Sequence, residues 1–362
     1  MDNIKEKHYR AWLKSIPGIG NRTAAALIQY FGSAQAVFHA DEKALYEGPR
    51  VNEKIVHNII QNRRIDMIQK QIEQMERYRI EILDIEEESY PLNLKHIYDP
   101  PYILYKKGQI LETDKNAVAI VGTRKASPYG KWAAYRLAGE LAKRGVTVVS
   151  GLAYGIDTEA HQGALDHGGR TIAVLGCGLD QCYPKSNVRL MQQIEKQGAV
   201  LSEYPVGMGP MAGNFPARNR IISGLAKGVV VVEAAARSGA LITAEFALEQ
   251  GREVFAVPGN INSELSEGTN RLIQEGAKLV SCVEDILEEL DMDTGSFQKP
   301  PEIELSEQES KIYQIIIQNQ PIHIESLLKK SEMRIDQVHG IITVLQLKGL
   351  IRQLPGNIIL SK

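Results

Sequence analysis

Hydrophobic and polar positions follow three different patterns along the chain, and each pattern occupies one region. Over the first 80 residues, apolar side chains recur every three to four positions, as from Trp12 to Ile16 and from Ala24 to Phe31. This spacing places the apolar side chains on one face of a helix. It predicts a helical domain over residues 1–80.

The second pattern consists of short apolar runs separated by helical stretches. The expected strands read AVAIV, TVVSG, TIAVLG, AVLSE, VVVVE, VFAV and KLVS. Continuous apolar runs of this kind indicate parallel strands buried on both faces, which is typical of α/β proteins. Residues 81–291 are therefore expected to form a doubly wound Rossmann-like parallel sheet, with ligands beyond the carboxyl ends of the strands.

The third pattern follows a segment with one glycine and two prolines, residues 292–304, which is expected to be a linker. Residues 305–362 then carry three amphipathic helical stretches and a short hairpin, IRQLPGNIIL. This order predicts a winged-helix-like domain. Such domains bind DNA or protein, and the mixed charges here leave both possibilities open.

Composition fits a globular protein, with 43 % hydrophobic and 24 % charged residues. The formal net charge of -2 neither requires nor excludes a nucleic acid partner. No segment reaches the roughly 18 apolar residues of a membrane span, and the start of the chain lacks a secretion signal, so a cytoplasmic protein without a membrane span is expected. Cys177, Cys182 and Cys282 lack paired C-x-x-C spacing, which disfavours a disulfide framework or a zinc site.

Two segments contain groups suited to phosphate. In IPGIGNRT, Gly18 and Gly20 form a turn between two helices, which resembles a helix-hairpin-helix grip on the DNA backbone but is equally a packing corner. After the first expected strand, GTRKASPYGK contains Gly122, Arg124 and Lys125 and no acidic residue. A phosphate site is the natural inference from this loop, and an incidentally basic surface loop is the alternative.

The second and third strands add further candidates. SGLAYGIDTEAH supplies Gly151 for a turn and places Asp157 and His161 four residues apart. We interpret Asp157 as a helix cap and His161 as a hydrogen-bonded histidine; the alternative is that the two side chains hold a metal or form an acid–base pair. GCGLDQCYPKSN lacks the third glycine of a dinucleotide fingerprint, so NAD binding is disfavoured. Its Lys185 lies next to Tyr183 and Pro184, a combination suited to phosphate contact and stacking.

The loop after the fourth strand combines an aromatic residue with basic ones. Phe215, Arg218, Asn219 and Arg220 lie at the start of an expected helix. Base stacking on Phe215 and phosphate neutralisation by the arginines are the two halves of single-strand recognition. Phe215 is alternatively a core plug that holds the loop in place.

The remaining loops, with Ser238, Gly239, Thr243, Gly259 and Asn260, are expected to frame the same rim. The sequence has no G-x-x-x-x-G-K-[ST] phosphate loop, no G-x-S-x-G elbow, no H-E-x-x-H and no metal-ligand cluster. We therefore expect no catalytic constellation, no metal and no cofactor, and hence a binding protein that is not an enzyme.

Seven ordered segments resemble the DNA-processing protein A (DprA/Smf) family over roughly residues 85 to 290: GTRKASPYG, VVSGLAYGIDTEAH, GCGLDQCYPKSN, SEYP, NFPARNRIISGL, VEAAARSGALITA and VFAVPGN. The resemblance implies a homodimeric, sequence-nonspecific single-stranded DNA-binding protein. It also implies that the protein protects incoming DNA during natural transformation, the uptake of DNA by competent cells. It further implies that the protein loads the RecA recombinase onto this DNA for homologous recombination. The two end domains match this family by pattern only.

Carried over by matching motif, the DNA-contacting residues would be Gly122, Thr123, Arg124, Gly151, Lys185, Phe215, Arg218, Asn219 and Arg220. Thr123 stands where the family commonly has serine, and it keeps the hydroxyl. One alternative is a nucleotide-binding hydrolase of the phosphoribohydrolase type, in which Glu203, Glu233 or Asp157 would do acid–base work. Another is an interaction scaffold with a vestigial pocket.

Overall fold

The computed structural model describes residues 4–292, 305–354 and 356–361, and it divides the chain into two compact units between residues 294 and 295. The expected linker at residues 292–304 lies outside the described residues except for Met292. The expected boundary near residue 80 falls inside the first unit and stays a prediction. Within the described residues, no helix has both the length and the apolar character needed to cross a membrane.

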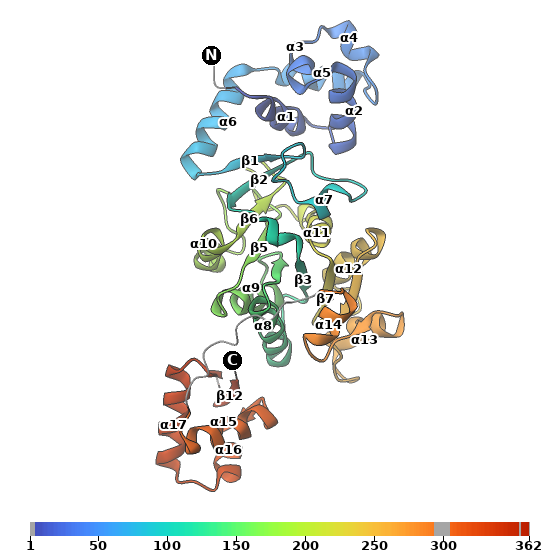
Figure 1. The fold of residues 1–362 in the computed structure, drawn as a ribbon. Coiled ribbons are helices and arrows are strands. Elements are labelled where there is room, and N and C mark those ends of the chain that lie inside the picture. Colours follow the sequence, from blue (N-terminus) through green and yellow to red (C-terminus); the bar gives the residue numbers. More distant parts are fainter. Residues whose placement is uncertain (1–3, 293–304, 355, 362) are drawn as a thin grey trace. The chain divides into compact units, whose positions relative to one another are not determined.

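The N-terminal part of the first unit is helical, as the spacing of its apolar residues predicted (Figure 1). The helices are α1 Glu6–Ser15, α2 Asn21–Phe31, α3 Ala34–His39, α4 Glu42–Glu47, α5 Glu53–Asn62 and α6 Ile65–Tyr78. Their apolar faces meet in a core around Leu13, Leu27 and Ile59. The indole of Trp12 donates to the carbonyl of Asn62 (2.7 Å), which links α1 to the end of α5.

A mostly parallel sheet forms the centre of the first unit. Its strands are β1 Glu81–Asp84, β2 Ile103–Gly108, β3 Ala117–Val121, β4 Thr147–Ser150, β5 Thr171–Leu175, β6 Ala199–Ser202, β7 Gly228–Val231, β8 Glu253–Ala256 and β9 Lys278–Leu279. They lie in the order β1-β2-β6-β5-β4-β3-β7-β8-β9. Strands β3 to β9 are the expected parallel strands, so the doubly wound prediction is confirmed, and the order reverses between β3 and β7. The antiparallel edge, β1 on β2 and β2 on β6, was not predicted.

Helices cover both faces of this sheet. One face carries α8 Pro128–Lys143, α9 Ile156–Asp166, α10 Val188–Gln197 and α14 Glu284–Glu289, and the other carries α7 Leu92–Lys95, α11 Asn214–Leu225, α12 Gly239–Glu249 and α13 Glu267–Gln274. Short 3-10 turns occur at Glu112–Lys115, Lys185–Asn187 and Glu264–Ser266. Along β3, Val118 and Ile120 pack towards α8 and α9, whereas Ala119 and Val121 pack towards α11 and α12. This double burial explains the uninterrupted apolar runs.

The second unit has winged-helix architecture, as predicted. Its elements are α15 Glu307–Asn319, β10 Ile322–His323, α16 Ile324–Ser331, α17 Ile335–Leu347, β11 Ile351–Leu354 and β12 Ile358–Ser361. The strands form a small sheet in the order β10-β12-β11. Ile316, Leu327 and Leu345 lie in its core. A capping box starts α15, because the side chains of Ser306 and Glu309 each accept from the other residue's backbone N–H.

Candidate nucleic-acid interface

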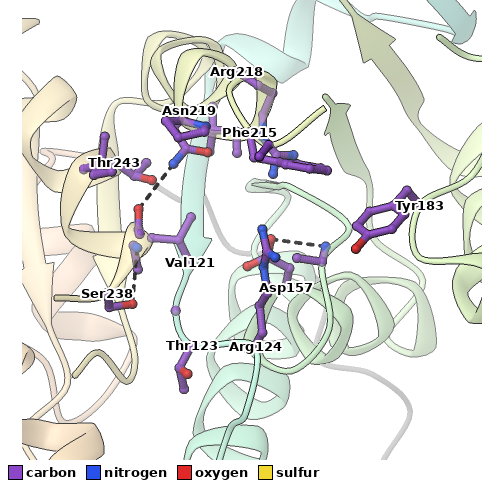
Figure 2. A pocket seen from close by; sticks show the side chains of 18 of the residues that line it. Val121, Thr123, Arg124, Asp157, Tyr183, Phe215, Arg218, Asn219, Ser238 and Thr243 are labelled. Atoms are coloured by element: carbon purple, nitrogen blue, oxygen red, sulfur yellow. Dashed lines mark hydrogen bonds between the residues drawn. The ribbon is translucent and has the colours of Figure 1, made fainter. Parts of the chain in front are cut away.

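A cavity of about 600 Å³ opens beyond the carboxyl ends of the strands, next to the reversal between β3 and β7. This is where doubly wound sheets bind their ligands. The lining comes from the β3–α8 loop, from α9 and the loop before it, from the loop after β5, and from the beginnings of α11 and α12. Its polar and aromatic members are Thr123, Arg124, Asp157, Tyr183, Phe215, Arg218, Asn219, Ser238 and Thr243 (Figure 2).

A smaller hollow adjoins the main cavity. Gly151, Tyr154 and Pro184 line it, together with residues that it shares with the main cavity: Arg124, Ala153, Tyr183, Phe215 and Arg218. The structure thus brings together Gly122, Thr123, Arg124, Gly151, Phe215, Arg218 and Asn219 from the expected set. Lys185 is exposed at the start of a 3-10 turn, directly after Pro184, and lines neither hollow.

Arg124 and Phe215 form the charged and aromatic part of the site. The guanidinium carbon of Arg124 lies 5.3 Å from the centre of the Phe215 ring, a cation–π distance. Within the described residues, Arg124 has no carboxylate partner, so its exposed positive charge is available to an anion. The ring of Tyr183 lies 5.4 Å from that of Phe215 at an interplanar angle of 39°. Figure 2 shows these three side chains on the same side of the pocket, across from Ser238 and Thr243.

Two glycines of the expected set are required by packing. A Cβ on Gly122 would lie 2.5 Å from the side chain of Ile156, and one on Gly151 would lie 2.5 Å from the guanidinium of Arg218. Both distances are far below van der Waals contact. The two glycines therefore let the strand ends meet helix α9 and the buried arginine, and this packing shapes the floor of the cavity.

Arg218 lines both hollows with a largely enclosed guanidinium, and the expectation that it neutralises phosphate stays a prediction. Its side chain is only 4 % exposed, and its Nη1 donates to the carbonyls of Gly151 (2.7 Å) and Val174. Burial lowers the pKa of this guanidinium. Arg218 therefore ties the ends of β4 and β5 to helix α11 and supports the pocket from beneath.

Arg220 lies outside the pocket, and the expectation that it contacts DNA stays a prediction. Two residues of a helix separated by one position point to nearly opposite sides. Arg220 accordingly faces a second hollow, where its guanidinium pairs with the carboxylates of Glu203 (2.7 Å) and Asp99 (3.4 Å). The amide of Asn21 also donates to Glu203 (2.8 Å), so this cluster joins the N-terminal helices to helix α11.

The N-terminus of α8 is closed by the protein's own carboxylate. Glu233, which is buried at the end of β7, accepts from the backbone N–H of Ser127 (2.9 Å) and from its hydroxyl (2.5 Å). The hydroxyl of Ser127 in turn accepts from the N–H of Gly130 (3.1 Å). Glu233 therefore occupies the hydrogen-bonding groups of Ser127 at the start of α8, whereas Arg124 and Lys125 stay exposed in the loop, and the phosphate site expected there stays a prediction.

Asp157 and His161 do not form a pair. Asp157 lines the pocket and accepts from the N–H of Ala153 (3.3 Å), and burial raises its pKa. His161 is fully buried, its Nδ1 is 2.6 Å from the hydroxyl of Thr171, and burial lowers its pKa to about 3. The histidine is thus a neutral core residue. Among the described residues, no group of His, Cys, Asp and Glu side chains is suited to a metal ion.

The opposite wall of the pocket is the start of α12. The hydroxyl of Ser238 accepts from the N–H of Ala240 (3.3 Å), and the amide of Asn219 donates to the carbonyl of Gly239 (3.3 Å). Thr243 adds a hydroxyl one turn further along. The sequence placed Ser238, Gly239 and Thr243 at the rim but not among the DNA-contacting residues. Asp157 and Tyr154 were not among those contacts either. The signal that could have indicated all of them is their position in loops that follow the strands on either side of the reversal.

Comparisons with known proteins agree with this architecture. The family model for DNA recombination-mediator protein A matches residues 81–291, and models for a SAM-like helix-hairpin-helix tandem and for the DprA winged-helix domain match residues 13–64 and 298–357. The protein Smf of Synechocystis is 33 % identical over 98 % of both chains. The chain belongs to the DprA/Smf family. DprA of Streptococcus pneumoniae is 50 % identical over 57 % of this chain and 72 % of that protein.

Solved DprA structures are also similar to this DprA/Smf protein. The X-ray structure of DprA from Streptococcus pneumoniae has a TM-score of 0.68 and 37 % identity, over 79 % of this chain and 98 % of that one. DNA processing protein A from Helicobacter pylori, described for its single-stranded DNA binding mode, has a TM-score of 0.53 and 34 % identity, over 59 % of this chain and 97 % of that one. The resemblance in the seven sequence segments is thereby confirmed as membership of the family. Several relatives in this family are named DNA processing proteins.

Proposed function

We propose that this protein binds single-stranded DNA without sequence preference, in the cavity between the β3–α8 loop and helices α11 and α12. The observation that carries the proposal is the exposed guanidinium of Arg124, which lies over the ring of Phe215 at a cavity of about 600 Å³. A cation joined to aromatic rings provides the two contacts that single strands use, phosphate neutralisation and base stacking. The binding of single-stranded DNA by the Helicobacter pylori relative supports the same assignment.

The shape of the site favours a single strand over a duplex. The cavity is recessed among loops and the starts of helices, so a base must leave its neighbours to enter it. Paired bases of a duplex are held in their stack and pay an unpairing cost first. The lining contains hydroxyls and backbone groups and a single acidic side chain, Asp157. These groups suit phosphate and sugar, which all sequences share.

Membership of the DprA/Smf family extends the proposal to recombination. We infer that the protein acts as a homodimer, protects incoming single strands in natural transformation, and loads the RecA recombinase onto them. Two pockets on one strand would raise the overall affinity without new contacts. The proposal places Lys185 at the outer edge of each strand path, because its exposed ammonium follows Tyr183 and Pro184 in the chain.

A nucleotide hydrolase is the second candidate, since Asp157 is an acidic side chain in the cavity and its pKa is raised. The other acids proposed for this role are engaged elsewhere. Glu203 pairs with Arg220, and Glu233 holds Ser127. A hydrolase of this kind would have to depend on Asp157.

The decisive experiment measures binding of labelled oligo-dT and of a matched duplex by fluorescence anisotropy across a salt series. We expect tight, salt-sensitive binding of the single strand and weaker binding of the duplex. Arg124→Ala should reduce the slope of log affinity against log salt by about 0.7, the share of one phosphate contact on a single strand. Absence of strand binding, or release of a base from a nucleoside monophosphate with Asp157→Asn inactive, would favour the hydrolase instead.

A further inference from the structure

Phe215 has little free ring surface for a base. The guanidinium of Arg124 lies over its ring, and the backbone of Gly176 approaches so closely that a Cβ there would lie 3.0 Å from a ring carbon. Tyr183 lies beside it at 5.4 Å between ring centres, too close for a base to slide between the two rings. Phe215 is therefore well placed to position Arg124 and Tyr183.

Two exposed tyrosines line the same small hollow as Phe215. Tyr154 is 50 % exposed and Tyr183 is 42 % exposed, and both line the small hollow that also includes Arg124 and Pro184. Among the described residues, neither tyrosine hydroxyl has a hydrogen-bond partner. Exposed aromatic rings next to a free cation are a feature of surfaces that bind single strands.

The loops that carry these tyrosines are fastened to each other. The amide of Asn187, four residues after Tyr183, donates to the carbonyl of Leu152 (3.0 Å) and to the hydroxyl of Thr158 (2.9 Å). The hydroxyl of Thr158 donates to the carbonyl of Ala153 (2.6 Å), so the residues around Tyr154 are held from both sides.

The backbone around Tyr154 is also held in an unusual conformation. Leu152 adopts a left-handed φ of 57°, which a side chain accepts only where surrounding contacts enforce it. Leu152 is fully buried, and Gly155 has a φ of 75° on the other side of Tyr154. The position of Tyr154 is thus built into the loop, and an aromatic pair ordered in advance costs little entropy when a ligand binds.

We propose that Tyr154 and Tyr183 form a stacking site for nucleobases beside the main cavity, with Phe215 as its support and Arg124 as the contact for the adjoining phosphate. This inference rests on the proposed function, since it specifies which side chains take the bases of the bound strand. It extends the strand path from the main cavity to the loop of Lys185.

The test compares Tyr154→Leu, Tyr183→Leu and both corresponding phenylalanine variants in the full chain. Leucine keeps an apolar side chain but removes the ring, whereas phenylalanine keeps the ring. Each variant is titrated by anisotropy with oligo-dT and with an abasic strand of the same length, which has the same phosphates and no bases. Tyr46→Leu is the matched control, because Tyr46 is also 50 % exposed and lies on α4, away from the site.

Each leucine variant should lower the affinity for oligo-dT about ten-fold, which corresponds to about 1.4 kcal/mol, and should leave the affinity for the abasic strand unchanged. The salt dependence should also stay the same, because no charge is removed. The phenylalanine variants and Tyr46→Leu should bind oligo-dT like the unaltered protein.

An unchanged affinity of both leucine variants for oligo-dT would overturn the proposal, as would equal losses on the two strands, since those would reveal a purely structural effect. Failure of the unaltered protein to bind oligo-dT would overturn the proposed function as well. The two failures are thus distinguishable in one titration series.

Discussion

Arg218 allows a direct test of whether a buried arginine supports the pocket or contacts the ligand. We consider Arg218→Met, which keeps most of the length and the apolar stem of the side chain and removes the guanidinium. The substitution leaves the carbonyls of Gly151 and Val174 without their donor in a region that water does not reach. It also removes the positive charge whose attraction lowers the pKa of Asp157 against the effect of burial.

The magnitude follows from these two losses. A buried carbonyl left without a partner costs about 1 to 3 kcal/mol, and Arg218→Met leaves two. The variant also avoids the desolvation cost of burying a guanidinium, which offsets part of the cost of the two carbonyls. We expect Arg218→Met to lower the free energy of unfolding of the first unit by about 3 kcal/mol. For a unit that spans Met1–Thr294 the corresponding fall in Tm is roughly 5 °C.

The assay is thermal unfolding followed by circular dichroism, combined with the salt series on oligo-dT. Arg124→Met is the matched control, because Arg124 is exposed and its loss should change the unfolding free energy by no more than about 0.5 kcal/mol. The control should instead reduce the salt slope by about 0.7. If Arg218→Met kept its Tm and reduced the salt slope as Arg124→Met does, the assignment of Arg218 as a support would be wrong.

Three further predictions concern charge and capping. Burial raises the pKa of Asp157, so its carboxylate takes up a proton at a higher pH than an exposed aspartate does. Because protonation removes a negative charge from the pocket, DNA affinity should increase as the pH falls, and Asp157→Asn should flatten this dependence in anisotropy titrations. Although burial raises it, Arg220 and Lys14 hold the pKa of Glu203 below its ordinary value. Stability from this group is present above about pH 4.3 and is lost as the pH falls through the lower folded-state pKa, so Glu203→Gln should be less stable at neutral pH and lose less in acid, as measured by urea unfolding. Ser127→Ala removes the cap of α8 and should lower the free energy of unfolding by about 1 kcal/mol, or roughly 1.5 to 2 °C in Tm by calorimetry.

Each of these three predictions has a result that would contradict it. A pH dependence of DNA affinity that persists in Asp157→Asn would place its origin elsewhere. Equal acid sensitivity of Glu203→Gln and the unaltered protein would mean that this cluster does not contribute to acid unfolding. A Ser127→Ala variant with unchanged Tm would show that the hydrogen bonds to Ser127 add nothing net to stability.

The parallel sheet was predictable because its signal is local and strong. Strands such as Ala117–Val121 are buried on both faces, so every position is apolar. The edge strand Glu81–Asp84 was missed because its residues run into an acidic segment that reads as a solvated junction. In the structure Ile82 and Leu83 are buried, and Asp84 pairs with Arg10 (2.5 Å), a partner 74 residues away. No local pattern contains a contact at that separation.

The site was predictable in its place and only partly in its residues. The loops after the strands meet where the topology requires, which gave Arg124 and Phe215, whereas Thr123 came from the family resemblance. The burial of Arg218 and the ion pairs of Arg220 were not predictable, because neither property depends on residue type alone. One geometric signal was available in the sequence, since positions 218 and 220 of one helix cannot both face the same ligand.

Glu233 has a consequence for competition among ligands. Rossmann-like sheets attract nucleotides because the helix after the first strand presents open amides to a diphosphate. Here the carboxylate of Glu233, attached to the neighbouring strand β7, already accepts from the backbone N–H and the hydroxyl of Ser127 at that position. A free nucleotide must compete with an anion whose effective concentration is on the order of mM or higher. We therefore expect small nucleotides to be poor inhibitors at this helix, and the proposed polymeric ligand, which binds through many phosphates together, to be less affected by this carboxylate.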